Sequence, residues 1–240
     1  MKEKIILALD MSSAEEARKT IDVFRDEVGA FKIGLQLFTA AGASFVREVT
    51  AAGVKVFLDL KFHDIPNTVS HAAVEAARMG VWMFNVHALG GGEMMRATVE
   101  KVEEACAADS LAKPKIIAVT VLTSSNAETL KEAGIEREIS EQVLKLAQLA
   151  SKCGLDGVVA SPRETALIRE NVESGEFLIV TPGVRPVFAT NDDQKRVMTP
   201  AEAVTAGANY LVIGRPVLKS EDPVGAIRQI IREMENVPAT

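Results

Sequence analysis

The side chains best suited to chemistry lie in one short stretch near residue 60. Asp59 and Lys61 stand at the end of an apolar run, and Asp64 follows three residues later. Because successive side chains of a strand point to opposite faces, Asp59 and Lys61 should point the same way, with Leu60 opposite. An ammonium group held beside carboxylates can stabilise negative charge and donate a proton. This stretch is therefore the first candidate for a catalytic centre.

Two further charged residues stand at or near the ends of earlier apolar runs. Asp10 follows the run Ile5–Leu9, and Lys32 lies near the end of the next run. Buried Asp and Lys side chains are rare unless each is paired with an opposite charge. We therefore expect these two residues to join Asp59 and Lys61 in an alternating network in which every charge is compensated.

The same charges allow two other interpretations. They could form a salt-bridge cluster that only closes one end of the fold. Alternatively, three carboxylates and His63 could ligate a divalent cation, the carboxylates being those of Asp10, Asp59 and Asp64. The two lysines argue against a metal site, because their ammonium groups occupy the space and supply the charge that a cation would. For His63 we expect a hydrogen-bonded structural role, and His87 could line a cavity or simply pack.

The elements that must position these residues are strands alternating with helices. Most of the apolar runs are rich in β-branched residues and apolar at successive positions, which is typical of parallel strands buried on both faces. Helical patterns follow them, such as Glu141–Lys152 and Asp222–Met234, and a capping-box spacing starts at Ser12 or Ser13. The eight predicted strands are Ile5–Leu9, Ala30–Ile33, Val54–Leu60, Trp82–Val86, Ile116–Leu122, Gly157–Ala160, Phe177–Val180 and Tyr210–Ile213.

Eight repeats of strand and helix predict a closed (β/α)8 TIM barrel of the α/β class. The alternative is an open doubly wound sheet, but the first strand-to-helix turn, Leu9-Asp10-Met11-Ser12, lacks the glycine-rich dinucleotide fingerprint. In a barrel the active site lies at the carboxyl ends of the strands, where the charges described above are found. No linker or change of composition divides the chain, so we expect a single domain over residues 1–240.

Composition narrows the class of ligand. The chain has 240 residues, close to the length of about 250 that is typical of one such barrel. Its net charge of −6 disfavours broad binding to nucleic acid, and no apolar stretch is long enough to span a membrane. Cys106 and Cys153 are too few for a disulfide framework and predict buried thiols in a reducing compartment. We therefore expect a cytoplasmic protein that binds a small molecule.

A phosphate-binding region is predicted after the last two strands. Gly214-Arg215-Pro216 follows the eighth strand, where glycine allows close backbone approach and arginine offers a bidentate fork. Arg185 and Gln194 lie in a long segment after the seventh strand. A loop of that length in a compact domain is usually functional, which fits a lid over the ligand.

The motifs together resemble one family, the orotidine 5′-monophosphate decarboxylases. The resemblance extends over essentially the whole chain, and its most specific part surrounds the charges near residue 60. The matching segments are Leu7-Ala8-Leu9-Asp10, Phe31-Lys32-Ile33-Gly34, Asp59-Leu60-Lys61-Phe62-His63-Asp64-Ile65-Pro66-Asn67-Thr68, Val119-Thr120-Val121-Leu122-Thr123-Ser124, Thr181-Pro182-Gly183-Val184-Arg185-Pro186 and Ile213-Gly214-Arg215-Pro216.

The resemblance implies an enzyme, a carboxy-lyase that needs no metal or organic cofactor. It would convert orotidine 5′-monophosphate to uridine 5′-monophosphate in the last step of pyrimidine synthesis. Lys61 would then stabilise the carbanion at C6 and protonate it, and Asp59 would lie near the departing carboxylate. Lys32 would bridge the carboxylates and the ribose, and Asp10 would bind the ribose hydroxyls. Ground-state repulsion by Asp59 and orientation of Lys61 both stay open as its role.

The resemblance also implies the remaining substrate contacts and a homodimer. The phosphate would be bound by Arg185, Gln194, Gly214 and Arg215, and the pyrimidine by Thr120, Pro182 and either Thr123 or Ser124. Thr68 belongs to the same implied binding set. Asp64, a catalytic residue of the family, and its neighbour Ile65 would reach the site of the other subunit.

Two alternative functions stay open from the sequence. The Asp-x-Lys-x-x-Asp spacing is also similar to metal-dependent sugar-phosphate decarboxylases and aldolases of the same barrel superfamily. In those relatives the position that matches Lys32 is typically a glutamate that binds magnesium, so the lysine here points away from them. The other alternative is a barrel that binds a nucleotide without turnover.

Overall fold

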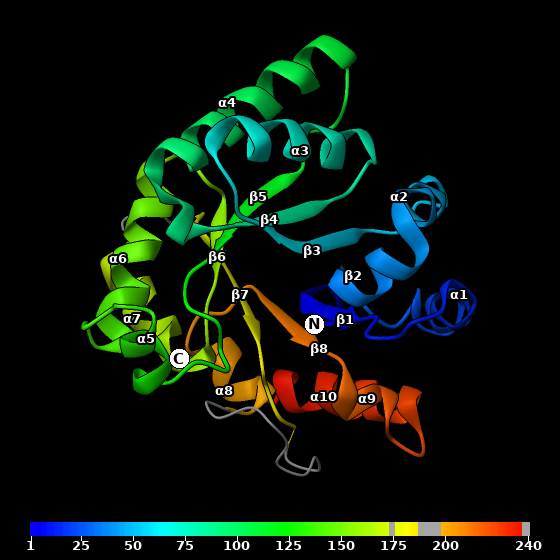
Figure 1. Ribbon diagram of the computed structural model, residues 1–240. Helices are drawn as coiled ribbons and strands as arrows, with labels where there is room; N and C mark the ends of the chain where they lie inside the picture. The colour runs from blue at the N-terminus through cyan, green and yellow to red at the C-terminus, as the bar shows by residue number, and fades with distance from the viewer. Residues whose placement is uncertain (173–175, 187–197, 237–240) are drawn as a thin grey trace.

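A computed structural model describes residues 1–172, 176–186 and 198–236 of the chain. In these residues, eight parallel strands pair in sequence order and close into a barrel, because β1 also pairs with β8 (Figure 1). The strands are β1 (Ile5–Ala8), β2 (Ala30–Gly34), β3 (Val56–Phe62), β4 (Met83–His87), β5 (Lys115–Val119), β6 (Gly157–Val159), β7 (Leu178–Pro182) and β8 (Tyr210–Ile213). The predicted (β/α)8 barrel is confirmed.

Helices surround the barrel and cover the outer face of the strands (Figure 1). The α-helices are α1 (Ala14–Phe24), α2 (Leu35–Ala51), α3 (Pro66–Arg78), α4 (Gly91–Asp109), α5 (Ala127–Glu132), α6 (Ile139–Lys152), α7 (Thr165–Asn171), α8 (Pro200–Thr205), α9 (Arg215–Leu218) and α10 (Pro223–Glu235). Short 3-10 helices are η1 (Lys2–Lys4), η2 (Ala88–Gly90) and η3 (Pro162–Glu164). None of the described helices is both long and apolar enough to cross a bilayer.

The core has two parts, one on each side of the strands. The larger part lies between the strands and the helices, which explains why the strands are apolar at successive positions. The smaller part fills the barrel interior and consists of Ile6, Ala8, Ala30, Phe57, Met83, Ile117, Val180 and Val212. These side chains fill the barrel interior, and the cavity described below lies nearer the carboxyl ends of the strands.

Seven of the eight predicted strands end one to three residues from the expected position, and the third and fifth of them bear on the site. The third was expected at Val54–Leu60 but runs to Phe62, and the fifth ends at Val119 instead of Leu122. At the fifth strand, the backbone N–H and the hydroxyl of Thr120 both donate to the carbonyl oxygen of Val159, at 3.2 and 3.0 Å. The strand ends here, and the next residues, Val121 to Thr123, line a cavity instead of extending the sheet.

Local capping follows the sequence signals closely. The Ser13 hydroxyl accepts a hydrogen bond from the Glu16 N–H and begins α1. A reciprocal capping box occurs between Thr199 and Glu202 at the start of α8.

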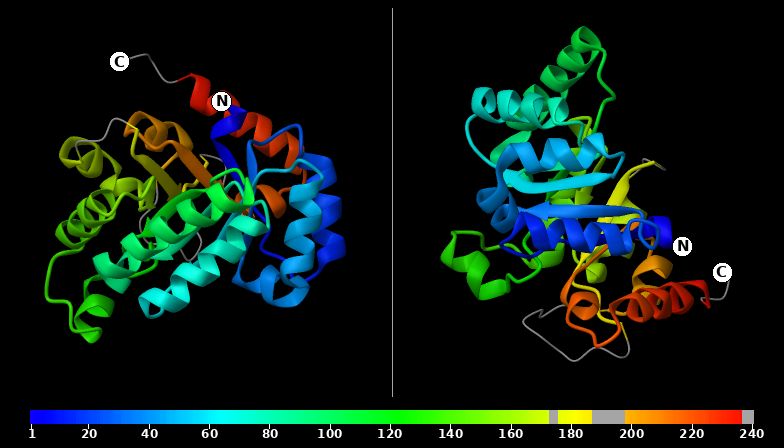
Figure 2. Two further views of the ribbon diagram at one scale, coloured as in Figure 1. Left: turned by 90° about the horizontal axis from the view of Figure 1, so that it is seen from above. Right: turned by 90° about the vertical axis from the view of Figure 1, so that its right-hand side faces the viewer.

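Figure 2 shows the amino-terminal segment beside α10, where the Met1 amino group lies 3.9 Å from the Glu235 carboxylate. The amino-terminal residue therefore lies beside the end of α10.

Candidate active site

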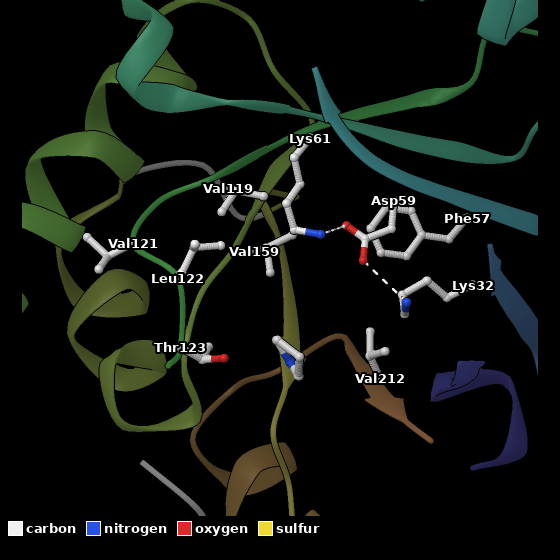
Figure 3. A pocket seen from close by; sticks show the side chains of 11 residues that line it. Lys32, Phe57, Asp59, Lys61, Val119, Val121, Leu122, Thr123, Val159 and Val212 are labelled. Carbon is white, nitrogen blue, oxygen red and sulfur yellow. Dashed lines mark hydrogen bonds and ion pairs between the residues drawn. The ribbon is translucent and has the colours of Figure 1, made fainter. Parts of the chain in front are cut away.

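Four charged side chains form a continuous chain of ion pairs at the carboxyl ends of β1, β2 and β3. The Lys61 Nζ lies 2.7 Å from Asp59 Oδ1, and Asp59 Oδ2 lies 3.4 Å from Lys32 Nζ (Figure 3). Lys32 Nζ in turn lies 3.1 Å from Asp10 Oδ1. The alternating network predicted from the sequence is present. Lys32 lies between two carboxylates, and Lys61 lies between the Asp59 carboxylate and the open cavity.

Burial increases toward the middle of this chain. The Lys32 and Asp59 side chains are only 12% and 14% exposed, whereas Lys61 is 31% and Asp10 is 52% exposed. Charge interactions are stronger where water is excluded, so the Asp59 pairs are the ones that fix the arrangement. The outer members, Lys61 and Asp10, are the ones a ligand can reach from solvent.

The charged groups form one side of a cavity whose other sides are mostly apolar. The cavity has a volume of about 180 Å³. Its lining consists of Lys32, Phe57, Asp59, Lys61, Val119, Val121, Leu122, Thr123, Val159, Pro182 and Val212 (Figure 3). Apolar walls with a few charges on one side suit a flat ring that carries its reactive atom toward those charges.

Sequence reasoning missed one residue of this network, Asn85 in β4. Its side chain is fully buried, and its Nδ2 donates to Asp59 Oδ1 at 2.7 Å. Its Oδ1 accepts a hydrogen bond from the Lys61 backbone N–H at 2.8 Å. The available signal was an amide residue in the middle of an apolar strand, a position where a polar side chain needs partners.

The residues expected to contact a pyrimidine are distributed around the cavity. Thr123 and Pro182 line it, whereas Ser124 is exposed and is not among the lining residues. Thr120 is fully buried, and its hydroxyl is bonded to the Val159 carbonyl oxygen. Thr123 thus lines the cavity and Ser124 does not, and the Thr120 hydroxyl links β5 to β6.

The predicted phosphate region lies after β7 and β8, on the same end of the barrel. Gly214 packs closely against β1, because a Cβ there would lie 3.2 Å from the Ala8 Cβ and 3.4 Å from Asp10 Oδ2. The Arg185 N–H donates to the Met198 carbonyl oxygen at 2.9 Å, and Arg215 begins α9. This places Arg215 directly after the residue that touches Asp10. Gln194 lies outside the described residues.

Asp64, Ile65 and Thr68 stand apart from the ion-pair chain. All three are exposed where β3 leads into α3, and the Asp64 Oδ1 accepts a hydrogen bond from the Ile65 N–H at 2.7 Å. Asp64 has no place in the ion pairs that the structure describes within a single subunit. Its only described hydrogen bond is thus the local one to the Ile65 backbone.

The donor set does not suit a divalent cation. In the described ranges, no three His, Cys, Asp or Glu side chains come together as metal ligands would. Lys32 Nζ lies between the carboxylates of Asp10 and Asp59, at 3.1 and 3.4 Å, where a metal ion would have to bind. The geometry therefore agrees with the sequence argument that lysine replaces the cation.

Two histidines stack beside the site at the ends of β3 and β4. The rings of His63 and His87 lie 5.2 Å apart at 21° to each other. Burial, followed by the nearby His63 and Lys61 charges, lowers the pKa of His87 from 6.5 to about 4. His87 is therefore neutral at physiological pH and packs as an uncharged ring. Both histidines act here through ring stacking.

Comparison with known proteins shows which protein family shares these features. The model of the orotidine 5′-phosphate decarboxylase / HUMPS family matches residues 3–230. The orotidine 5′-phosphate decarboxylase of Geobacter metallireducens is 57% identical over 233 residues, which cover 97% of this chain and 96% of the relative. That of Syntrophotalea carbinolica is 54% identical over 233 residues, with 97% and 95% covered.

Solved structures show the same similarity. The orotidine 5′-phosphate decarboxylase of Lactobacillus acidophilus has a TM-score of 0.84 at 37% identity, covering 96% of this chain and 98% of that chain. The corresponding structure from Pyrococcus horikoshii has a TM-score of 0.74 at 26% identity, covering 97% and 100%. The resemblance therefore extends over nearly the full length of each protein.

The lowered pKa of His87 predicts a pH-dependent loss of stability. The unfolded chain takes up a proton near pH 6.5, whereas the folded chain resists it until about pH 4. The free energy of unfolding should therefore fall as the pH decreases through this window, and His87→Gln should remove that part of the fall. Denaturant unfolding at several pH values measures it, referenced to about pH 7.5, where His87 is neutral in both the folded and the unfolded chain. Parallel curves for wild type and variant would contradict the assignment.

Proposed function

The chain belongs to the orotidine 5′-phosphate decarboxylase / HUMPS family, and from this premise we infer that it decarboxylates orotidine 5′-monophosphate (OMP). The products are uridine 5′-monophosphate (UMP) and CO2, so the enzyme is a carboxy-lyase of pyrimidine biosynthesis. The family name also covers HUMPS, but the two relatives described above, each more than half identical to this chain, carry the decarboxylase name. The decarboxylase reaction is therefore the function that this chain supports best.

The observation that carries this proposal is the Lys61–Asp59–Lys32–Asp10 chain on one side of an apolar cavity. Decarboxylation breaks the bond between C6 and the carboxylate, and the electron pair stays on C6 as CO2 leaves. A fixed ammonium group beside C6 stabilises that charge in a site with few competing water molecules. Lys61 then donates a proton to C6, which gives UMP and a neutral amine that regains its proton from solvent.

The other charges orient the substrate and Lys61. Asp59, which is ion-paired with both lysines, would lie near the departing carboxylate and keep the Lys61 ammonium directed into the cavity. Asp10 is the most exposed member and is proposed to bind the ribose hydroxyls, with Lys32 between ribose and carboxylates. None of these steps needs a metal ion or organic cofactor.

The far end of the substrate is proposed to bind at the loops after β7 and β8. Arg215 and Arg185 supply guanidinium groups for the phosphate, and Gly214 allows the backbone to approach closely. Gln194 belongs to the same proposal through the resemblance of its segment. Binding energy from the phosphate, far from C6, can be used to hold the pyrimidine against Lys61.

We also propose that the active form is a homodimer with shared sites. Four large apolar side chains that are 44–65% exposed follow β2, β3, β4 and β5 in turn, namely Leu35, Ile65, Leu89 and Leu122. Because these strands are neighbours in the barrel, the side chains form one arc of the rim, which a second copy could cover. Asp64 lies beside Ile65 in this arc, where it could reach the partner's Lys61.

The buried free thiols of Cys106 and Cys153 further support action in the cytoplasm.

Replacing the proton donor tests the reaction directly. Wild type should convert OMP to UMP and CO2, followed spectrophotometrically, and a chelator should leave the rate unchanged. Lys61→Ala should lower kcat by at least about 10³-fold, because both the fixed charge and the proton are lost. Lys145→Ala, an exposed lysine on α6, is the matched control and should keep full activity.

Three outcomes would count against this assignment. Wild type that forms no UMP would refute the decarboxylase function. Activity lost with the chelator would favour the metal-dependent alternative. Near-full turnover by Lys61→Ala would show that another group protonates C6.

Mixing two inactive variants tests the shared site. If Asp64 acts across the dimer, Lys61→Ala and Asp64→Ala should each be inactive alone. Their random mixture should regain about a quarter of the wild-type rate, because half of the dimers are mixed and one site in each is intact. Subunits are exchanged by brief mild denaturation, and mock-treated single variants serve as controls. No recovery in a mixture shown to contain mixed dimers would place Asp64 in its own subunit's site.

A further inference from the structure

The strand that carries the catalytic pair does not follow regular pairing with its neighbour. Leu58 of β3 pairs with Phe84 of β4, and the next pair is Phe62 with Val86. Between these pairs β3 contains Asp59, Leu60 and Lys61, whereas β4 contains only Asn85. The backbone of β3 therefore bulges where its two functional side chains are found.

The bulge includes an unusual backbone conformation at Lys61. Its φ angle is +54°, in the left-handed region that residues with a side chain disfavour. Such a conformation persists only where surrounding contacts hold it. In the bulge, the Lys61 N–H has no partner in the regular ladder, and it donates instead to the Asn85 side-chain oxygen at 2.8 Å.

Asn85 is placed to hold both members of the catalytic pair at once. It shares the inward-facing side of β4 with Met83, which belongs to the interior core. Its oxygen binds the Lys61 backbone, and its nitrogen donates to Asp59 Oδ1 at 2.7 Å. The same carboxylate oxygen accepts from Lys61 Nζ at 2.7 Å. One amide thus links the start and the end of the bulge.

We propose that Asn85 is a positioning residue for the reaction, and this inference rests on the proposed decarboxylase function. It is fully buried and is not among the cavity-lining residues, so it acts through Asp59 and Lys61 and not on the substrate. It fixes the left-handed turn at Lys61 and orients the Asp59 carboxylate that directs the Lys61 ammonium. The amide is the suitable group, because the two contacts require one acceptor and one donor.

The first test separates kcat from KM. Asn85→Leu removes both hydrogen bonds at similar volume and should lower kcat by about 10²-fold, because small displacements of reacting groups have effects of that size. KM for OMP should change by only a few-fold, since the phosphate contacts are untouched. Thr98→Val is the matched control, since it removes a buried hydroxyl in α4 that bonds to the Met94 carbonyl oxygen. It should keep kcat even if it lowers the unfolding temperature.

A second variant adds a pH signature that a purely structural role would not produce. Asn85→Asp keeps the acceptor for the Lys61 N–H but replaces the donor by a carboxylate facing Asp59. Around position 85 lie Asp59 and Lys61 from β3, His87 further along β4, and the apolar Ile117 opposite it on β5. When the introduced carboxyl is protonated it can again donate to Asp59. The kcat of Asn85→Asp relative to wild type should therefore rise as the pH falls.

Three results would overturn the proposal. The first is unchanged kcat in Asn85→Leu. The second is a loss that follows stability alone, with Thr98→Val losing as much at equal destabilisation. The third is a kcat ratio for Asn85→Asp that does not vary with pH.

If neither Asn85 variant folds, amide hydrogen exchange of the wild type tests whether Asn85 holds the Lys61 backbone. The Lys61 N–H should be strongly protected, and rapid exchange would show that Asn85 does not hold it. This measurement also separates the two claims. Wild type without OMP turnover refutes the function, whereas protection of the Lys61 amide still reports on the bulge.

Discussion

The ion pair between Lys61 and Asp59 is the interaction on which the rest of the site depends. A carboxylate that is 14% exposed is costly to bury unless it is paired and hydrogen-bonded. Asp59 meets this requirement with two lysines and the amide of Asn85, at distances of 2.7 to 3.4 Å. The same contacts leave the Lys61 ammonium directed into an apolar cavity, where a developing negative charge has few other partners. Burial of one charge thus creates the conditions for catalysis.

The barrel separates the tasks of the site around its rim. Strands β1 to β3 carry the ion pairs, whereas the loops after β7 and β8 carry Arg185 and Arg215. Because β8 pairs with β1, the proposed phosphate end and Asp10 are adjacent, and Gly214 packs against both Ala8 and Asp10. The exposed apolar arc follows β2 to β5, so it shares β2 and β3 with the ion pairs and lies away from the loops after β7 and β8. A substrate with a phosphate at one end and a reacting carbon at the other matches this arrangement.

Much of the fold and the position of the charged residues could be predicted from the sequence, because both follow simple periodicities. Apolar runs predicted the strands, and alternation along β3 predicted that Asp59 and Lys61 would point to the same side. The bulge was not predictable, because it depends on a tertiary hydrogen bond from Lys61 to Asn85 on a different strand. Thr120 shows the same limit, since its hydroxyl bonds to β6. The proposed role of Asp64 lies in a second subunit, which no pattern in a single chain reveals.

The most direct test of the central claim is a crystal structure of the enzyme with UMP bound. The account predicts the pyrimidine in the cavity beside Val119 and Pro182, with C6 about 3–3.5 Å from Lys61 Nζ, as a near-attack geometry requires. The phosphate should then contact Arg215. A pyrimidine bound with C6 turned away from Lys61, or a nucleotide bound outside this cavity, would contradict the account.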